Sequence, residues 1–324
     1  MNSNELNGDP LPKIAVLLSA YNEEDKISDT INSIINQTYK SLKIYLVDDF
    51  SSDSTAYLME CYKTDRRIKV ISNKFNKGLT KSLYDTVKII KEPYIARIDS
   101  GDFWRPDKIE KQVKELLIDP NIVLIGTQTD YYDTISGTQG RSNFPISDLE
   151  IRKAFFYGRG VNSHSMIIFK NILNYRKEML YSQDLDLYMR LAEFGKVICL
   201  NEVLGSTQIS SDGISSRKKA LQMTYINICY LNLVRRTQGR EESFNRNDKI
   251  FLKKFLYRIS QPTYKKYIKS SHNKEYLAAY LFLIFSCIVN PYFLIDYLNR
   301  ATRYLFIEHT KLYRGYLKKY SFQE

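Results

Sequence analysis

Two pairs of aspartates stand where apolar runs of the chain end. Asp48 and Asp49 close one run, and Asp99 and Asp102 follow another. Carboxylates at the edge of a parallel sheet can hold a hard divalent cation while phosphate oxygens fill its other positions. Acidic residues after a strand can instead cap the next helix. Two such pairs on one edge favour a ligand site over capping alone.

The elements that position these aspartates follow from hydrophobic periodicity. Apolar runs that predict strands lie at 14–18, 44–47, 68–71, 94–98 and 122–125. Between the first two, Ile27, Ile31 and Ile34 recur with the period of a helix, for which Asn22 is the predicted N-cap. Strand–helix alternation of this kind predicts an α/β fold with a mostly parallel sheet flanked by helices. Right-handed crossovers then bring the carboxyl ends of the strands to one edge.

The chain changes character after residue 126. Residues 127–165 are rich in Thr, Ser, Gly, Asp and Tyr and predict strands joined by long loops, whereas 183–194 predict a helix. A polar stretch up to residue 219 predicts a mobile loop, and helical character begins at residue 220. The expected parts are a polar tail at 1–12, an α/β domain at 13–220 and a helical C-terminal segment at 221–324.

Charge is concentrated at the C-terminal end. The net charge is +12, and residues 241–324 hold 15 basic and 7 acidic side chains together with 11 of the 26 tyrosines. A basic, aromatic-rich segment indicates an anionic partner, either nucleic acid or a membrane surface. The apolar run at 276–289 has 14 residues, fewer than the roughly 20 that a spanning helix needs, so a buried or interfacial helix is expected.

Cysteine usage and the N-terminus bear on the compartment. The four cysteines are far apart and have no metal-binding spacing, which argues against a zinc site or a disulfide framework. Residues 1–13 have no apolar core of the kind a secretory signal contains. Both features predict a cytoplasmic protein.

Five segments, in order, resemble the signatures of bacterial family 2 glycosyltransferases. They are Ser19-Ala-Tyr-Asn-Glu23, Val47-Asp-Asp-Phe-Ser-Ser-Asp-Ser-Thr55, Asn76-Lys-Gly-Leu-Thr-Lys-Ser-Leu83, Ala96-Arg-Ile-Asp-Ser-Gly-Asp102 and Pro106-Asp-Lys-Ile-Glu-Lys-Gln112. The likeness covers roughly residues 13–217. It implies the GT-A fold, a Rossmann-like sheet that binds a nucleotide-sugar donor.

The resemblance assigns donor-binding roles to several side chains. Ser19, Tyr21 and Asn22 lie in the loop that cradles the nucleotide base, where Tyr21 stacks on the base or is an ordinary half-buried tyrosine. Asp49 matches the aspartate that accepts an N–H of the base. Lys81 and Arg97 are candidates for the diphosphate oxygens, although cations on α/β surfaces are often merely solvated.

The metal motif departs from the family pattern. Asp99 and Asp102 match its metal-binding segment, but Gly101 stands where an aspartate is usual. Either Asp102 takes over as the ligand, with Asp99 contacting ribose or metal, or metal binding is weaker. The expected cofactor is Mg²⁺ or Mn²⁺, which would stabilise the departing nucleotide diphosphate.

Asp184 occupies the catalytic-base position of the family. It follows Gln183, which replaces the usual Glu, and it either removes the acceptor hydroxyl proton or only caps its helix. Asp186 is predicted to form a surface pair with Arg190. His164 matches a position on the acceptor side, or is a plain hydrogen-bonding residue.

The implied reaction is inverting sugar transfer from a nucleotide-diphosphate sugar to a saccharide, lipid-linked or free, in surface polysaccharide synthesis. Such enzymes work at the cytoplasmic membrane face, so the basic segment is expected to meet anionic lipid rather than nucleic acid. The polar stretch 210–217 resembles a loop that closes over the donor. One alternative is a sugar-phosphate nucleotidyltransferase, although its Gly-rich loop is missing between Leu18 and Ile27. The other is a non-catalytic membrane- or nucleic-acid-binding module.

Overall fold

A computed structural model describes residues 11–133, 137–156, 167–209, 219–244 and 315–316. The chain divides into two compact units, and each is described by itself. The first comprises Met1–Arg217 with Lys319–Glu324, and the second comprises Lys218–Lys318. Every described residue of the candidate site belongs to the first unit.

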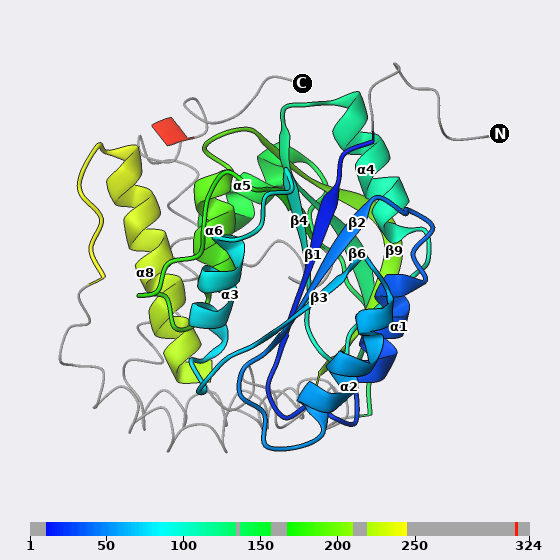
Figure 1. Ribbon diagram of the computed structural model, residues 1–324. Helices are drawn as coiled ribbons and strands as arrows, with labels where there is room; N and C mark the ends of the chain where they lie inside the picture. Colours follow the sequence, from blue (N-terminus) through cyan, green and yellow to red (C-terminus); the bar gives the residue numbers. More distant parts are fainter. Residues whose placement is uncertain (1–10, 134–136, 157–166, 210–218, 245–314, 317–324) are drawn as a thin grey trace. The chain divides into compact units, whose positions relative to one another are not determined.

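Four parallel strands form one half of a nine-stranded sheet (Figure 1). They are β1 (Ile14–Ala20), β2 (Leu42–Asp48), β3 (Ile68–Ser72) and β4 (Tyr94–Ile98), in the order β3-β2-β1-β4. Strands β1, β2 and β4 are largely buried, as their continuous apolar runs require. Their carboxyl ends share one edge, which confirms the predicted placement of the aspartate pairs.

The second half of the sheet is mixed. It contains β5 (Phe103–Trp104), β6 (Ile122–Asp133), β7 (Gln139–Arg141), β8 (Ile168–Lys170) and β9 (Lys196–Ile209). Strand β8 runs antiparallel between β4 and β6, whereas β6 and β9 are parallel. The predicted fifth strand ended at residue 125, but pairing with β9 extends β6 by eight residues, to Asp133.

Helices cover both faces of the sheet. In Figure 1, α1 (Ile27–Ile35), α2 (Thr55–Cys61) and α4 (Lys108–Ile118) lie on one side, and α3 (Leu79–Val87), α5 (Asp148–Phe156) and α6 (Gln183–Leu191) on the other. A 3₁₀ turn, Tyr62–Thr64, follows α2. The predicted isoleucine stripe of α1 is fully buried at Ile27, Ile31 and Ile34. Of the region predicted to form strands and long loops, β6 and β7 confirm the strands, whereas helix α5 was not predicted.

Lys108, the first residue of α4, is a lysine buried in the core. Lys108 has no exposed surface, its ammonium lies 4.1 Å from the centroid of the buried Trp104 ring, and it donates to Oε1 of Gln112 at 2.7 Å. Burial lowers the pKa of Lys108 well below its usual value. The core therefore holds a cation whose neighbours are an amide and an aromatic face.

The second unit is described mainly by α8 (Lys219–Thr237). Tyr225, Cys229 and Leu233 are buried at helical spacing, which confirms helical character after residue 220. The predicted apolar helix at 276–295 lies outside the described residues, and the C-terminal segment as a domain stays a prediction. Within the described part of the chain, no helix combines the length and apolarity needed to cross a membrane.

Candidate functional site

Two loops at the sheet edge are joined through Asn22. Its side-chain Oδ1 accepts from the backbone N–H of Ser52 at 2.8 Å, and its own N–H donates to Oγ of Ser51 at 3.0 Å. Its φ of +54° is left-handed, a conformation that asparagine tolerates. Helix α1 begins at Ile27, so the predicted N-cap role was wrong. Asn22 instead connects the β1–α1 loop to the β2–α2 loop.

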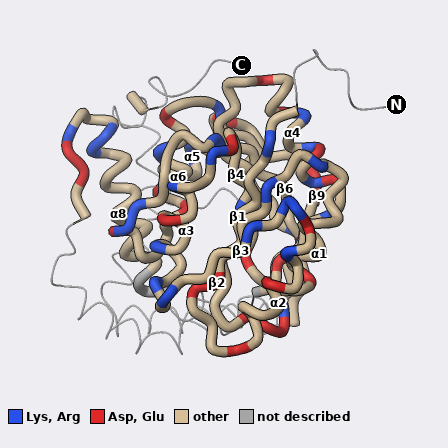
Figure 2. The backbone as a smooth tube through the Cα atoms, in the orientation of Figure 1, with Lys and Arg blue, Asp and Glu red and all other residues tan. Residues whose placement is uncertain are grey.

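The side chains around this junction differ in exposure. Tyr21 is 47% exposed beside Asn22, so its ring presents a surface to solvent at the sheet edge. Ser19 is half-buried near the end of β1, where it pairs in register with Val47. Figure 2 shows acidic residues around the beginnings of α1 and α2, next to these loops. Tyr21 therefore offers an open aromatic face here, as does Phe50 of the β2–α2 loop, which is 55% exposed.

Asp49 holds the loop that precedes α3. Its buried carboxylate accepts hydrogen bonds from Nδ2 of Asn73 at 2.7 Å and from Oγ of Ser82 at 2.9 Å. It also accepts the backbone N–H groups of Lys77 at 2.9 Å and Gly78 at 2.8 Å. Burial without such donors would be costly for a carboxylate, and four donors satisfy it. The sequence placed Asp49 correctly at the edge but did not reveal this network.

Lys81 lies one turn further along, on the exposed side of α3. The helix starts at Gly78, whose φ of +82° is left-handed and favours glycine. The loop fixed by Asp49 therefore positions the start of α3, with Lys81 in its first turn, at the edge of the sheet where the parallel strands end.

Arg97 lies at the centre of the candidate site. Its side chain is 1% exposed, one guanidinium nitrogen donates to Oδ1 of Asp99 at 2.7 Å, and the other terminal nitrogen donates to Oδ1 of Asp184. Burial alone would lower the pKa of Arg97, but the charges of Asp184 and Asp99 outweigh it and hold this pKa well above its usual value. An arginine on an α/β surface would point outward into solvent. Arg97 instead points inward and is not solvated.

Aromatic side chains enclose this ion triad. Tyr175 and Tyr188 are buried, and both rings pack against Phe169, with centroids 6.5 Å and 6.3 Å from its own. Burial raises the pKa of both phenols, and the negative charge of Asp184 adds to the shift. Exclusion of water strengthens the attraction between Arg97 and its two carboxylates. Neither tyrosine was predicted as part of the site.

Helix α6 presents Asp184 in its first turn. The preceding Ser182 has a φ of +54°, and Gln183 is buried, whereas the Asp184 side chain keeps 15% exposure. A partly exposed carboxylate at a helix N-terminus is favoured by the helix dipole. Arg97 therefore holds the Asp184 carboxylate from the protein interior, while the exposed part of that side chain is open to a substrate.

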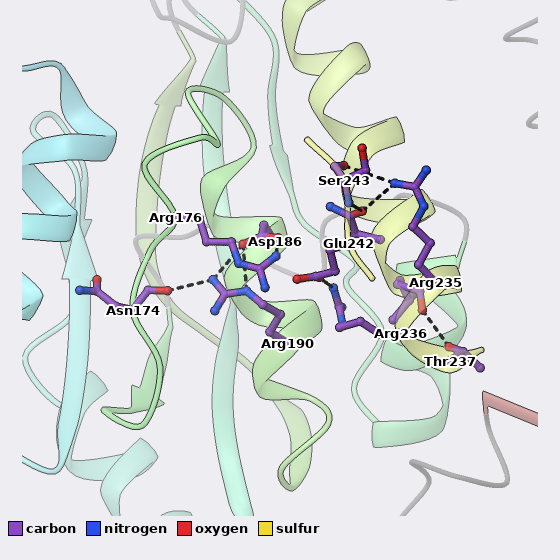
Figure 3. Close-up of polar contacts among 11 residues, drawn as sticks. Asn174, Arg176, Asp186, Arg190, Arg235, Arg236, Thr237, Glu242 and Ser243 are labelled. Atoms are coloured by element: carbon purple, nitrogen blue, oxygen red, sulfur yellow. Dashed lines mark hydrogen bonds and ion pairs between the residues drawn. The ribbon is translucent and has the colours of Figure 1, made fainter. Parts of the chain in front are cut away.

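Asp186 is part of the protein interior rather than its surface. It is 1% exposed and pairs with Arg190 at 2.8 Å and with Arg176 at 3.4 Å (Figure 3). Arg190 also donates to the carbonyl of Asn174 at 2.9 Å. The predicted pair with Arg190 is confirmed, but its predicted surface location was wrong. This cluster ties α6 to the segment that precedes it.

The metal motif forms a tight loop after β4. Gly101 has a φ of +87°, and a Cβ there would lie 3.1 Å from Cδ of Lys26. Thr30 of α1 fixes the loop, because its Oγ1 accepts from the N–H of Gly101 at 3.0 Å and donates to the carbonyl of Asp102 at 3.1 Å. Glycine at this position is thus explained by the backbone, independently of metal binding.

The donor set for a cation consists of two carboxylates on this loop. Asp99 is 31% exposed and faces Arg97, and Asp102 is 9% exposed. Among the described residues, no group of three or more His, Cys, Asp or Glu side chains could hold a metal ion. Two carboxylates still fit Mg²⁺, which commonly binds one or two of them and takes its other ligands from water and phosphate. His164 and the 210–217 loop lie outside the described residues.

Comparison with known proteins identifies the family. Residues 15–177 match the sequence model of Glycosyl transferase family 2. An uncharacterized glycosyltransferase of Haemophilus influenzae is 31% identical over 219 residues, covering 63% of this chain and 68% of the relative. The putative glycosyltransferase EpsE of Bacillus subtilis is 30% identical over 213 residues, covering 64% and 76%. The chain belongs to glycosyltransferase family 2 and is a glycosyltransferase.

A further relative and a solved structure add detail. WfgD of Escherichia coli, described as a UDP-Glc:alpha-D-GlcNAc-diphosphoundecaprenol beta-1,3-glucosyltransferase, is 24% identical over 208 residues, covering 63% of this chain and 80% of WfgD. The crystal structure of S. aureus TarS with UDP-GlcNAc is similar at a TM-score of 0.53 and 14% identity, covering 82% and 89%. This likeness confirms the predicted GT-A fold.

Proposed function

We propose that this chain transfers a sugar from a nucleotide-diphosphate sugar to a saccharide hydroxyl with inversion of the anomeric centre. The observation that carries the proposal is the buried Arg97 that joins Asp184 to Asp99. It supports a role for Asp184 in proton removal, because it links this carboxylate to the loop expected to meet the donor diphosphate. Family membership favours sugar transfer over nucleotidyl transfer or a non-catalytic binding module.

In the proposed reaction Asp184 takes the proton of the acceptor hydroxyl as that oxygen attacks the anomeric carbon. The bond from the anomeric carbon to the diphosphate oxygen breaks on the opposite face, and its electron pair leaves with the nucleotide diphosphate. Arg97 fixes the direction of the Asp184 carboxylate from inside the protein. A positioned general base of this kind contributes about 10²–10⁴-fold to the rate.

Donor binding is assigned to the sheet edge. Tyr21 offers its exposed ring to the base, and Ser19 and Asn22 shape the loop around it. Asp49, which already fixes the loop before α3, would accept an N–H of the base through Oδ2, the oxygen that takes one of its four hydrogen bonds. Lys81 would face the diphosphate. His164 is retained as a candidate on the acceptor side.

Asp99 and Asp102 would hold the divalent cation, Mg²⁺ or Mn²⁺. When bound, the cation would neutralise the charge that develops on the departing diphosphate. Fixing of the loop by Thr30 and Gly101 supports this assignment, because it sets both aspartates on a rigid turn.

The acceptor and the cellular setting follow from the relatives. WfgD is named for transfer to a diphosphoundecaprenol-linked sugar, and Escherichia coli chondroitin synthase, 25% identical over 214 residues, is named for a polysaccharide. We therefore infer a role in bacterial polysaccharide synthesis, on a lipid-linked or free saccharide acceptor. The basic segment 241–324 would hold the enzyme at the anionic cytoplasmic face of the membrane.

Calorimetry of nucleotide binding tests the donor assignment. UDP, GDP, dTDP and CMP are titrated with and without Mn²⁺ into the full chain and into Tyr21→Ala. We expect one nucleotide to bind, more tightly with Mn²⁺, and about tenfold more weakly in Tyr21→Ala, because base stacking on an aromatic ring is worth about 1–3 kcal/mol. Tyr57→Ala, which removes an exposed ring from α2, serves as the control and leaves binding unchanged. If none of the four nucleotides binds, the proposal is contradicted.

A further inference from the structure

A cavity of about 680 Å³ opens beside the metal motif. It is enclosed by the start of α1, the loop at 101–103, the β6–β7 hairpin and the end of β9. Its volume lies in the range of small-molecule sites, about 300–1,000 Å³. Of the residues assigned above to donor, metal or base, only Asp102 lines it. The cavity is thus a neighbour of the proposed donor site and shares Asp102 with it.

The cavity has aromatic walls that the fold keeps in place. Phe103 is 47% exposed and Tyr132 is 42% exposed, so both rings present open faces. Tyr131 lies over Gly140, its partner across the hairpin, and a Cβ on Gly140 would meet the Tyr131 hydroxyl oxygen at 2.5 Å. Glycine at 140 therefore makes room for the tyrosine ring.

The strands beneath the cavity are paired directly. Ser206 of β9 is in register with Asp130 of β6 on one side and with Phe103 of β5 on the other. The opposite wall is held by Thr30, whose two hydrogen bonds fix the loop at Asp102 to α1. Polar and aromatic groups of the lining thus stand on paired strands and on a helix, which is a preorganised arrangement.

The charge of the lining disfavours direct contact with phosphate groups. Four aspartates and one lysine line the cavity, namely Asp25, Asp29, Asp102, Asp130 and Lys26. Lys26 pairs with Glu23 at 3.6 Å, and Asp130 is held by Arg141 at 3.1 Å and by Arg105 at 4.0 Å. An excess of carboxylates repels diphosphate and accepts hydrogen bonds from hydroxyl or ammonium groups.

We propose that this cavity binds a neutral or amino saccharide unit of the acceptor glycan, remote from the hydroxyl that reacts. The apolar face of a sugar ring would stack on Phe103 and Tyr132, and its hydroxyl groups would donate to the aspartates. The inference rests on the proposed function and adds a second contact to the acceptor. It predicts preference for uncharged or cationic sugars over uronic acids.

Ligand-observed NMR on the full chain tests the inference without knowledge of the natural acceptor. The probes are cellobiose, N,N′-diacetylchitobiose, glucosamine and glucuronic acid, with the nucleotide that binds by calorimetry as an independent measure of the donor site. We expect at least one of the first three to bind and glucuronic acid not to bind. Tyr132→Ala and Phe103→Ala should each weaken that binding at least fivefold and leave nucleotide binding unchanged.

Matched controls separate the cavity from general damage. Tyr57→Ala, an exposed tyrosine of α2 outside the cavity, should leave saccharide binding unchanged, and thermal unfolding shows whether each variant folds. Failure of all three neutral or amino probes to bind overturns the inference, as does equal binding of glucuronic acid. Unchanged saccharide binding in both cavity variants overturns it too.

These outcomes are distinct from failure of the proposed function. In one case no nucleotide binds, whereas a saccharide binds to the wild type and not to the cavity variants. The donor assignment then fails, and the saccharide site stands. If a nucleotide binds normally and the cavity variants have no effect on saccharide binding, the saccharide site fails and the proposed donor site stands.

Discussion

Arg97 and Lys108 are both buried cations, yet their surroundings are opposite. Arg97 donates to two carboxylates, Asp99 and Asp184, which come from different segments of the chain. Lys108 contacts an amide oxygen and the face of Trp104. Burial lowers the pKa of Lys108, whereas the two carboxylates outweigh burial at Arg97 and raise its pKa.

The difference lies in the partners. Paired carboxylates keep Arg97 charged, and through it Asp99 and Asp184, which are both assigned to the proposed site, are held in one geometry. At Lys108 the stem is buried and the side-chain nitrogen has one amide acceptor and an aromatic face, so burial is not offset by an opposite charge and lowers the pKa. A buried charge therefore indicates a site when its partners are themselves charged and partly exposed, as Asp99 and Asp184 are.

The largest expected effect is that of Asp184→Asn. The amide cannot accept the acceptor proton, so turnover should fall about 10²–10⁴-fold while nucleotide binding is retained. Donor turnover and calorimetry on the same preparation provide the measurement. Asp107→Asn, a partly exposed aspartate at the start of α4, is the control and should keep full activity. Full activity in Asp184→Asn would remove Asp184 from the proposed mechanism.

Replacement of Arg97 tests the bridge itself. In Arg97→Met, Asp99 and Asp184 face an apolar side chain in place of the guanidinium. The substitution should lower the free energy of unfolding by about 3 kcal/mol and abolish turnover. Arg97→Lys keeps the charge but lacks the two-pronged guanidinium, so it should recover much of the stability and little of the activity. Urea unfolding and initial rates check both. Equal activity in Arg97→Lys and the wild type would show that bridging is not required.

Gly101→Asp restores the usual family residue in the metal motif. The left-handed backbone and the contact with Lys26 should make it destabilising by about 1–3 kcal/mol. We expect no gain in Mn²⁺-dependent nucleotide binding, because strain moves the loop that carries Asp99 and Asp102. Gly101→Ala, which meets the same backbone cost without a carboxylate, is the comparison. Tighter Mn²⁺-dependent binding in Gly101→Asp alone would contradict this interpretation.

The smallest effect concerns Lys108 and depends on pH. Since the pKa of Lys108 is lowered in the folded protein, the unfolded chain binds more protons between that pKa and about 10.4, and stability should rise with pH over this interval. Lys108→Met should lose that rise and be equally or more stable by about 1 kcal/mol at neutral pH. Urea unfolding at pH 7 and pH 9.5 measures it, with the exposed Lys114→Met as control. A wild-type stability that falls with pH relative to Lys108→Met would reverse the argument.

Much of the first half of the fold could be predicted from the sequence. Strands β1 and β4 and the buried stripe of α1 were read from periodicity, because a strand or helix face must be apolar where it meets the core. The aspartates at strand ends were placed for the same reason. In the second half, α6 confirms the helix predicted at 183–194. The predicted fifth strand, however, ended at residue 125, since the extension of β6 depends on β9, a strand about 70 residues further along the chain.

The sequence by itself determined the family, the sharing of one sheet edge by the parallel strands' carboxyl ends, and the candidate residues of the site. Only the tertiary structure decided what those residues touch: Arg97 and Asp184 are 87 residues apart, and Asn22 bonds to a residue 30 positions away. It also moved Asp186 from the surface to the interior and assembled the cavity from four separate segments. Local patterns encode burial and period, whereas the partners of a charge are set by which distant segments the topology brings together.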